Sequence, residues 1–123
     1  MKTFMLIFIG GGIGSVLRYY ISILFKSNST NFPWSTFIAN ILGCFLIGII
    51  VGLIYKYFTL NNEITSFFII GFCGGLTTFS TFANENFNLF NSNQIEVMIL
   101  YIISSILIGI AMIFLGLFSS KFI

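Results

Sequence analysis

One run of residues in the middle of the chain has the composition most able to bind an ion. It covers residues 71–82, reads Gly-Phe-Cys-Gly-Gly-Leu-Thr-Thr-Phe-Ser-Thr-Phe, and interrupts a long apolar stretch. Glycine weakens a helix by about 1 kcal/mol and threonine is β-branched, so a helix is expected to break here. In a membrane the freed carbonyls can bind a cation, and the N-terminus of the second half-helix can favour an anion. A close helix crossing, with the hydroxyls bonded to the preceding turn, is the simpler alternative.

Two phenylalanines in this run stand at helical spacing. Phe79 and Phe82 are three residues apart, so they would share one face of a helix. The edge of a phenyl ring is electropositive and can sit against an anion. Because the chain has 17 phenylalanines, packing in a core or against lipid also accounts for such a pair.

Polar side chains also occur inside the other apolar stretches. Arg18 and Asn40 lie within the first and second of them, and polar groups inside a membrane usually face an interior or a pathway. Arg18 could instead extend to the membrane surface, and Asn40 could bond to a neighbouring helix without any role in transport. Tyr101, Ser104 and Ser105 add hydroxyls to the fourth stretch, where by themselves they indicate packing.

Four membrane-spanning helices would position these residues. Of the 123 residues, 58% are hydrophobic and 7% are charged, whereas a soluble domain has about 25% charged residues. Apolar segments run over about residues 4–25, 34–58, 64–90 and 95–120, and about 20 helical residues suffice to cross a bilayer. With only short polar linkers between them, the sequence predicts an all-α membrane protein, a single four-span unit over residues 1–123.

Glycines four residues apart predict close crossings between these helices. The pairs are Gly10 with Gly14, Gly48 with Gly52, and Gly71 with Gly75. Four helices enclose little space, so we expect an oligomer. The net charge of +2 and the scattered basic residues argue against a nucleic-acid partner. Cys44 and Cys73 lie in apolar segments of a chain without histidine, which indicates small helix-interface residues rather than zinc ligands.

Three motifs, in this order, resemble the Fluc/CrcB fluoride channel family. They are Gly11-Gly12-x-Gly14-Ser15-x-x-Arg18-Tyr19, then Asn40-x-x-Gly43, then the run over residues 71–82. The resemblance covers the whole chain, including its length, its number of spans and the order of the motifs, and the third motif is the most specific. It implies a fluoride-selective channel in the cell membrane, through which cytoplasmic fluoride leaves passively and so becomes less toxic.

The resemblance also implies an assembly. Identical subunits inserted in opposite orientations would form an antiparallel, dual-topology homodimer, with fluoride pathways along its interface. A structural sodium ion, which is not transported, would lie at the dimer centre on backbone carbonyls of both subunits. By position in this sequence, those carbonyls belong to Gly74 and Thr77.

The same resemblance implies which side chains meet fluoride. Arg18 would sit near an aqueous vestibule and attract anions. Fluoride holds its water tightly, so the pathway must supply substitutes such as amide N–H groups, hydroxyls and ring edges. The residues that would line the pathway are Asn40, Phe79, Ser80, Phe82, Tyr101 and Ser105.

Two residues fit this pattern less well. Gly109 stands one turn beyond Ser105, where the hydroxyl track of the fourth span would be expected to continue. Glu85, about one turn past Phe82, is expected to face the vestibule or to bond to threonine or asparagine, and it receives no role.

Three other classes of protein fit the sequence less well than a channel. A small proton-coupled drug exporter needs a carboxylate within the membrane, and residues 4–25 contain none while Glu85 comes late in the third span. A structural assembly subunit would explain the glycine spacing but not residues 74–82. An enzyme is not expected, because the chain has no histidine, three scattered glutamates and no nucleophile beside a base.

Overall fold

The computed structural model describes residues 1–25, 31–57 and 62–123, and these are helical apart from short turns. The elements are α1 (Lys2–Leu24), α2 (Trp34–Tyr57), α3 (Asn62–Ile64), the π-helical segment η1 (Thr65–Cys73), α4 (Gly74–Leu76), α5 (Phe79–Asn91), α6 (Ile95–Ser119) and the 3₁₀ turn η2 (Ser120–Phe122). The described residues contain no strand. The predicted end of the second span at residue 58 lies outside them.

Four segments of the described chain are long and apolar enough to cross a membrane. They are Lys2–Leu24, Trp34–Tyr57, Asn62–Asn91 and Ile95–Phe122. The predicted all-α architecture with four spans is therefore confirmed, with boundaries shifted by a few residues. The third span is the composite one, because α3, η1, α4 and α5 follow one another within it.

Local signals explain where two of the helices begin. The Pro33 carbonyl accepts from the Phe37 amide at 3.1 Å, so Pro33 stands just before α2, where a missing N–H leaves no gap. A tight turn between α5 and α6 is closed by hydrogen bonds from the Asn93 amide to the Phe90 carbonyl and from the Gln94 amide to the Leu89 carbonyl, at 3.0 and 2.9 Å. Asn93 adopts a φ of 58° there, a conformation that asparagine tolerates well.

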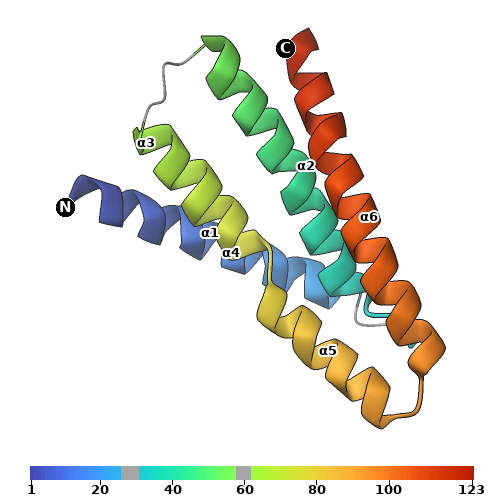
Figure 1. Cartoon of the computed structure of the whole chain (residues 1–123). Coiled ribbons are helices and arrows are strands. Elements are labelled where there is room, and N and C mark those ends of the chain that lie inside the picture. Colours follow the sequence, from blue (N-terminus) through green and yellow to red (C-terminus); the bar gives the residue numbers. More distant parts are fainter. Residues whose placement is uncertain (26–30, 58–61) are drawn as a thin grey trace.

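The spans pack as two pairs, as Figure 1 shows: α2 lies beside α6, and α1 crosses the first half of the third span. Glycines make the second contact close. A Cβ atom at Gly14 would meet the Phe72 carbonyl oxygen, and one at Gly75 would meet the Gly11 carbonyl oxygen. At the α2–α6 contact, a Cβ at Gly48 would likewise meet the Ile113 carbonyl. The predicted glycine crossings are therefore confirmed.

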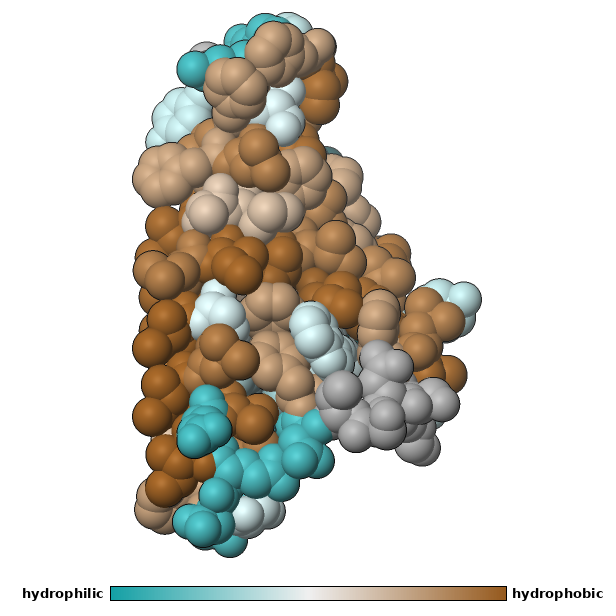
Figure 2. Space-filling view, turned by 90° about the vertical axis from the view of Figure 1, so that its right-hand side faces the viewer, coloured by the Kyte–Doolittle hydropathy of each residue, from teal (hydrophilic) through white to brown (hydrophobic). Residues whose placement is uncertain are grey.

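Most of the molecular surface is apolar. Figure 2 shows hydrophobic residues over most of one face, with hydrophilic residues gathered toward its two ends. Between 11% and 22% of each span's most apolar window is buried. A small cluster built on Ile21, Ala39 and Leu76 forms the interior. The remaining apolar surface suits contact with lipid or with another copy of the chain.

Candidate functional site

The third span breaks in its middle. Thr77 and Thr78 are extended, with φ/ψ of −83°/156° and −151°/122°, between the end of α4 at Leu76 and the start of α5 at Phe79. These two residues lie at the centre of the span Asn62–Asn91. The interruption predicted within residues 71–82 is therefore confirmed, at Thr77–Thr78 just after the glycine pair. Gly74 and Gly75 themselves remain helical.

Asn40 of α2 forms hydrogen bonds with the backbone at the break. Its Oδ1 accepts from the Thr78 amide at 2.8 Å, and its Nδ2 donates to the Thr78 carbonyl at 3.3 Å. Asn40 therefore satisfies both backbone groups of an extended residue, much as a neighbouring strand would. Of the side chain's two amide protons, one is used in this way, which leaves the other to meet a ligand.

At the break, two backbone amides donate to side chains instead of to the carbonyls that they would reach in a continuous helix. In a continuous helix the Thr78 amide would donate to the Gly74 carbonyl and the Thr81 amide to the Thr77 carbonyl. Here the Thr78 amide donates to Asn40, and the Thr81 amide donates to the Thr78 hydroxyl at 3.3 Å. Gly74 and Thr77 are the residues whose carbonyls were predicted to hold sodium. Carbonyl oxygens are suitable ligands for a hard cation, so the local backbone fits that assignment.

A polar cavity opens on one side of the break. It has a volume of about 390 Å³, and we call it the vestibule. Arg18, which the resemblance assigns to a vestibule, lines this cavity, and its Nε donates to the Gly75 carbonyl at 3.1 Å. The remaining lining residues are Ser15, Tyr19, Ser22, Ser35, Thr36, Thr78, Thr81 and Glu85. Hydroxyls, one guanidinium and the Glu85 carboxylate thus line a cavity that reaches the N-terminus of α5.

A second cavity, of about 370 Å³, also adjoins the break. We call it the groove, and it is lined by Asn40, Cys44, Ile47, Thr77, Thr78, Phe79, Phe82, Ser105 and Ile106. Four of the predicted pathway residues, Asn40, Phe79, Phe82 and Ser105, therefore meet in one place. Thr78 lines both cavities, so the vestibule and the groove adjoin each other at the start of α5.

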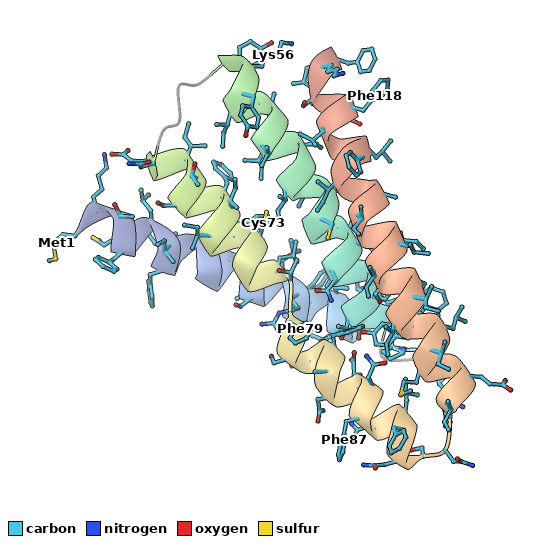
Figure 3. The ribbon with its side chains drawn as sticks, viewed as in Figure 1. Met1, Lys56, Cys73, Phe79, Phe87 and Phe118 are labelled. Atoms are coloured by element: carbon cyan, nitrogen blue, oxygen red, sulfur yellow. The ribbon has the colours of Figure 1, made fainter. Side chains whose placement is uncertain are left out.

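The two phenylalanine rings differ in their surroundings. Their centroids lie 6.0 Å apart. Phe82 also packs on Tyr101, 4.9 Å between centroids, whereas Phe79 is 80% exposed at the break (Figure 3). One ring is thus anchored in the protein, and the other projects from its surface.

The hydroxyl groups of the fourth span differ in their hydrogen-bond partners. Ser105 Oγ is buried in the groove without a hydrogen-bond partner among the described residues. Ser104 Oγ instead donates to the Tyr101 carbonyl at 3.3 Å. At the next turn, a Cβ at Gly109 would lie 3.5 Å from Cys44 Sγ, so the predicted track meets a thiol there. Ser80 does not line the groove, and its hydroxyl lies 3.3 Å from that of Thr78.

Glu85 is a site residue to which no role was assigned from the sequence. Its carboxylate faces the vestibule and accepts two hydroxyl hydrogen bonds, from Thr36 at 2.7 Å and from Tyr101 at 2.8 Å. The expectation that Glu85 faces the vestibule or bonds to threonine is confirmed. The prediction placed Tyr101 with Ser105 on one track, whereas the structure directs its hydroxyl to Glu85. Thr36 was missed, although it lies one helical turn before Asn40 and so shares its face.

Comparisons with known proteins identify relatives of nearly the whole chain. A family model described as CrcB-like protein, Camphor Resistance (CrcB), matches residues 5–117. A protein from Phocaeicola vulgatus named fluoride-specific ion channel FluC is 48% identical over 122 residues, covering 98% of this chain and 100% of that protein. A protein of the same name from Azobacteroides pseudotrichonymphae is 46% identical over 123 residues, covering 99% and 98%. Another from Pyrococcus abyssi is 37% identical over 116 residues, covering 94% of both chains.

Proposed function

The chain belongs to the CrcB-like protein family. We propose that it is a channel through which fluoride leaves the cytoplasm down the electrochemical gradient of fluoride. The chain is a multi-pass membrane protein and not an enzyme. The relatives are named as fluoride-specific ion channels, which supports fluoride as the ion and disfavours both a drug exporter and an assembly subunit. The observation that carries the route is the break at Thr77–Thr78, which puts a helix N-terminus between two cavities.

The proposed route begins in the vestibule. Arg18 attracts the anion there, and the hydroxyls of Thr78 and Thr81 take the place of its first water molecules. The N-terminus of α5 carries about half a positive charge, and this favours an anion that passes between the two cavities. Glu85 is the opposing charge, and its two hydroxyl donors, Thr36 and Tyr101, offset it.

The route then follows the groove. The spare N–H of Asn40 and the unpartnered Ser105 hydroxyl supply donors, and the edges of Phe79 and Phe82 supply weakly electropositive walls. The Ser80 hydroxyl lies beside that of Thr78 and supplies a further hydrogen-bond donor to the anion at the start of α5. No carboxylate lines the groove among the described residues. An anion that gives up its water there meets donors rather than a repelling charge.

The groove requires a second subunit to become a closed pathway. Phe79 is 80% exposed, and its ring covers only one side of the groove. We therefore propose an antiparallel, dual-topology homodimer in the cell membrane, in which the second copy supplies the opposite wall. The small buried share of each span supports an extensive contact with lipid and with that copy.

A structural sodium ion between the two breaks completes the proposal. The Gly74 and Thr77 carbonyls have lost their usual helical donors, and the same carbonyls of the second copy would double the number of ligands. When bound, sodium supplies positive charge in a region of low dielectric constant, where charge acts strongly. Purification with N-methylglucamine in place of sodium is expected to lower the melting temperature of the dimer. An unchanged melting temperature would contradict a structural role for sodium in the dimer.

Reconstitution tests the function directly. Liposomes that contain the purified chain and potassium fluoride are treated with valinomycin, so that potassium balances the charge, and a fluoride electrode records efflux. We expect rapid efflux from these liposomes and none from protein-free ones. If protein with intact helical content and a monodisperse size profile releases no fluoride, the proposed function is wrong.

A further inference from the structure

The C-terminal ends of α2 and η2 bring two lysines together. Lys56 stands in the last turn of α2, and its Nζ donates to the backbone carbonyl of Lys121 at 3.5 Å. The Tyr57 hydroxyl donates to the Ile123 carbonyl at 3.3 Å, which ties the two ends a second time. Figure 3 shows Lys56 and Phe118 at these neighbouring ends of α2 and α6. Both ammonium groups are thus carried at one end of the molecule.

This end carries positive charge that the rest of the described protein does not neutralise. Neither Lys56 nor Lys121 forms an ion pair with a carboxylate in residues 1–25, 31–57 and 62–123. Lys2 provides the contrast, because it forms an ion pair with Glu63 at 2.7 Å.

Exposed aromatic rings surround the two lysines. Lys56 lies 4.8 Å from the centroid of the Tyr57 ring, and Lys121 lies 5.9 Å from that of Phe118. Tyr55 and Phe122 add further exposed aromatic surface, at 81% and 77%. Aromatic residues and lysines at the ends of spans sit at the level of lipid headgroups, so this end of the protein meets the boundary between hydrocarbon and water.

We propose that Lys56 and Lys121 bind the phosphate of an anionic phospholipid, whose acyl chains lie along Phe118, Phe122 and the neighbouring apolar helix surface. Paired lysines beside a span attract anionic headgroups, and the rings beneath them contact acyl chains. An inorganic phosphate would use the lysines alone, whereas the apolar surface directly below favours a lipid. Binding of a lipid at this end of the protein does not depend on fluoride conduction.

Native mass spectrometry of the full chain in detergent tests the proposal. The probes are phosphatidylglycerol and phosphatidylcholine of the same chain length, added separately. The wild type is expected to retain phosphatidylglycerol preferentially. Neutralising each lysine should weaken retention about fivefold, so that Lys56→Gln with Lys121→Gln removes most of the preference. Inorganic phosphate that displaces phosphatidylglycerol at equal concentration would contradict a lipid site.

Two matched variants control for net charge and for folding. Lys2→Gln removes a lysine that is already paired, so it is expected to leave the preference unchanged. Lys56→Arg with Lys121→Arg keeps both charges and should retain the lipid. The proposal is overturned if the double glutamine variant, with helical content intact, retains phosphatidylglycerol like the wild type. It is also overturned if Lys2→Gln loses as much as the double variant.

Discussion

Replacement of Asn40 by aspartate tests the proposed route at the residue that joins it to the helix break. Asn40 accepts from the Thr78 amide at 2.8 Å and donates to the Thr78 carbonyl at 3.3 Å. Aspartate keeps the acceptor but turns an oxygen toward the carbonyl in place of the donor. Leaving that carbonyl without its partner costs about 1–3 kcal/mol of stability.

The new charge has the larger effect on conduction. Asn40 lines the groove, and a carboxylate there about 4 Å from a passing anion repels it by about 4 kcal/mol at an effective dielectric constant of about 20. Since about 1.4 kcal/mol corresponds to a factor of ten in rate, fluoride flux should fall roughly a thousandfold. The variant should therefore lose far more flux than its loss of stability would explain.

Fluoride efflux from liposomes and the melting temperature in detergent separate the two effects. Asn40→Ala is the matched control, because it removes both hydrogen bonds with Thr78 and adds no charge. We expect the aspartate variant to be much slower than the alanine variant, whose flux shows how much conduction is lost with the two hydrogen bonds alone. Wild-type efflux through Asn40→Asp, or equal efflux through the two variants, would refute the placement of the anion route beside Asn40.

Three further changes probe the ring walls, the helix crossing and the buried carboxylate. Phe79→Ile removes an electropositive ring edge from the groove, so efflux should fall at least tenfold while the oligomeric size in gel filtration stays the same; unchanged efflux would exclude the ring. Gly14→Ala places a Cβ against the backbone of the third span, so the melting temperature should fall by the equivalent of about 1–3 kcal/mol of stability. Gly12→Ala is the control, because a Cβ there would meet nothing within 4 Å and should leave the melting temperature unchanged. Equal melting temperatures for the two variants would contradict the close crossing. Tyr101→Phe deprives Glu85 of one donor, so unfolding in denaturant should require about 1–3 kcal/mol less, and an unchanged midpoint would show that the bond at 2.8 Å adds no net stability.

The sequence predicted the spans well because their signal is local. Each apolar stretch is long enough to cross a bilayer by itself, so its position can be counted along the chain. The break was also predicted, but its exact residues were not. Glycine pairs lower helix propensity, yet Gly75 packs on the backbone of α1, and this contact keeps it helical. The chain opens instead at Thr78, where Asn40 supplies substitute partners.

The arrangement around Glu85 could not be predicted in the same way. Its partners Thr36 and Tyr101 come from α2 and α6, 49 and 16 residues away in sequence. No periodicity within one span indicates such a meeting of three spans. The π-helical geometry of Thr65–Cys73 was also not foreseen, because it has no distinctive residue pattern. What the pattern did indicate was a costly carboxylate late in the third span, and such a residue needs donors wherever it lies.

The break explains how one segment can present opposite charges at one depth, and why a cation strengthens the proposal. The helical stretch that ends at Leu76 directs unpaired carbonyls toward the break, while α5 directs its first N–H groups toward the same region. Each helix end carries about half a charge, of opposite sign, so a bare break would attract an anion only weakly. A sodium ion on the Gly74 and Thr77 carbonyls would neutralise the negative end and leave the positive end of α5 unopposed. In this proposal the cation therefore acts on anion selection as well as on assembly, through the same redirected hydrogen bonds that Asn40 and Thr78 create.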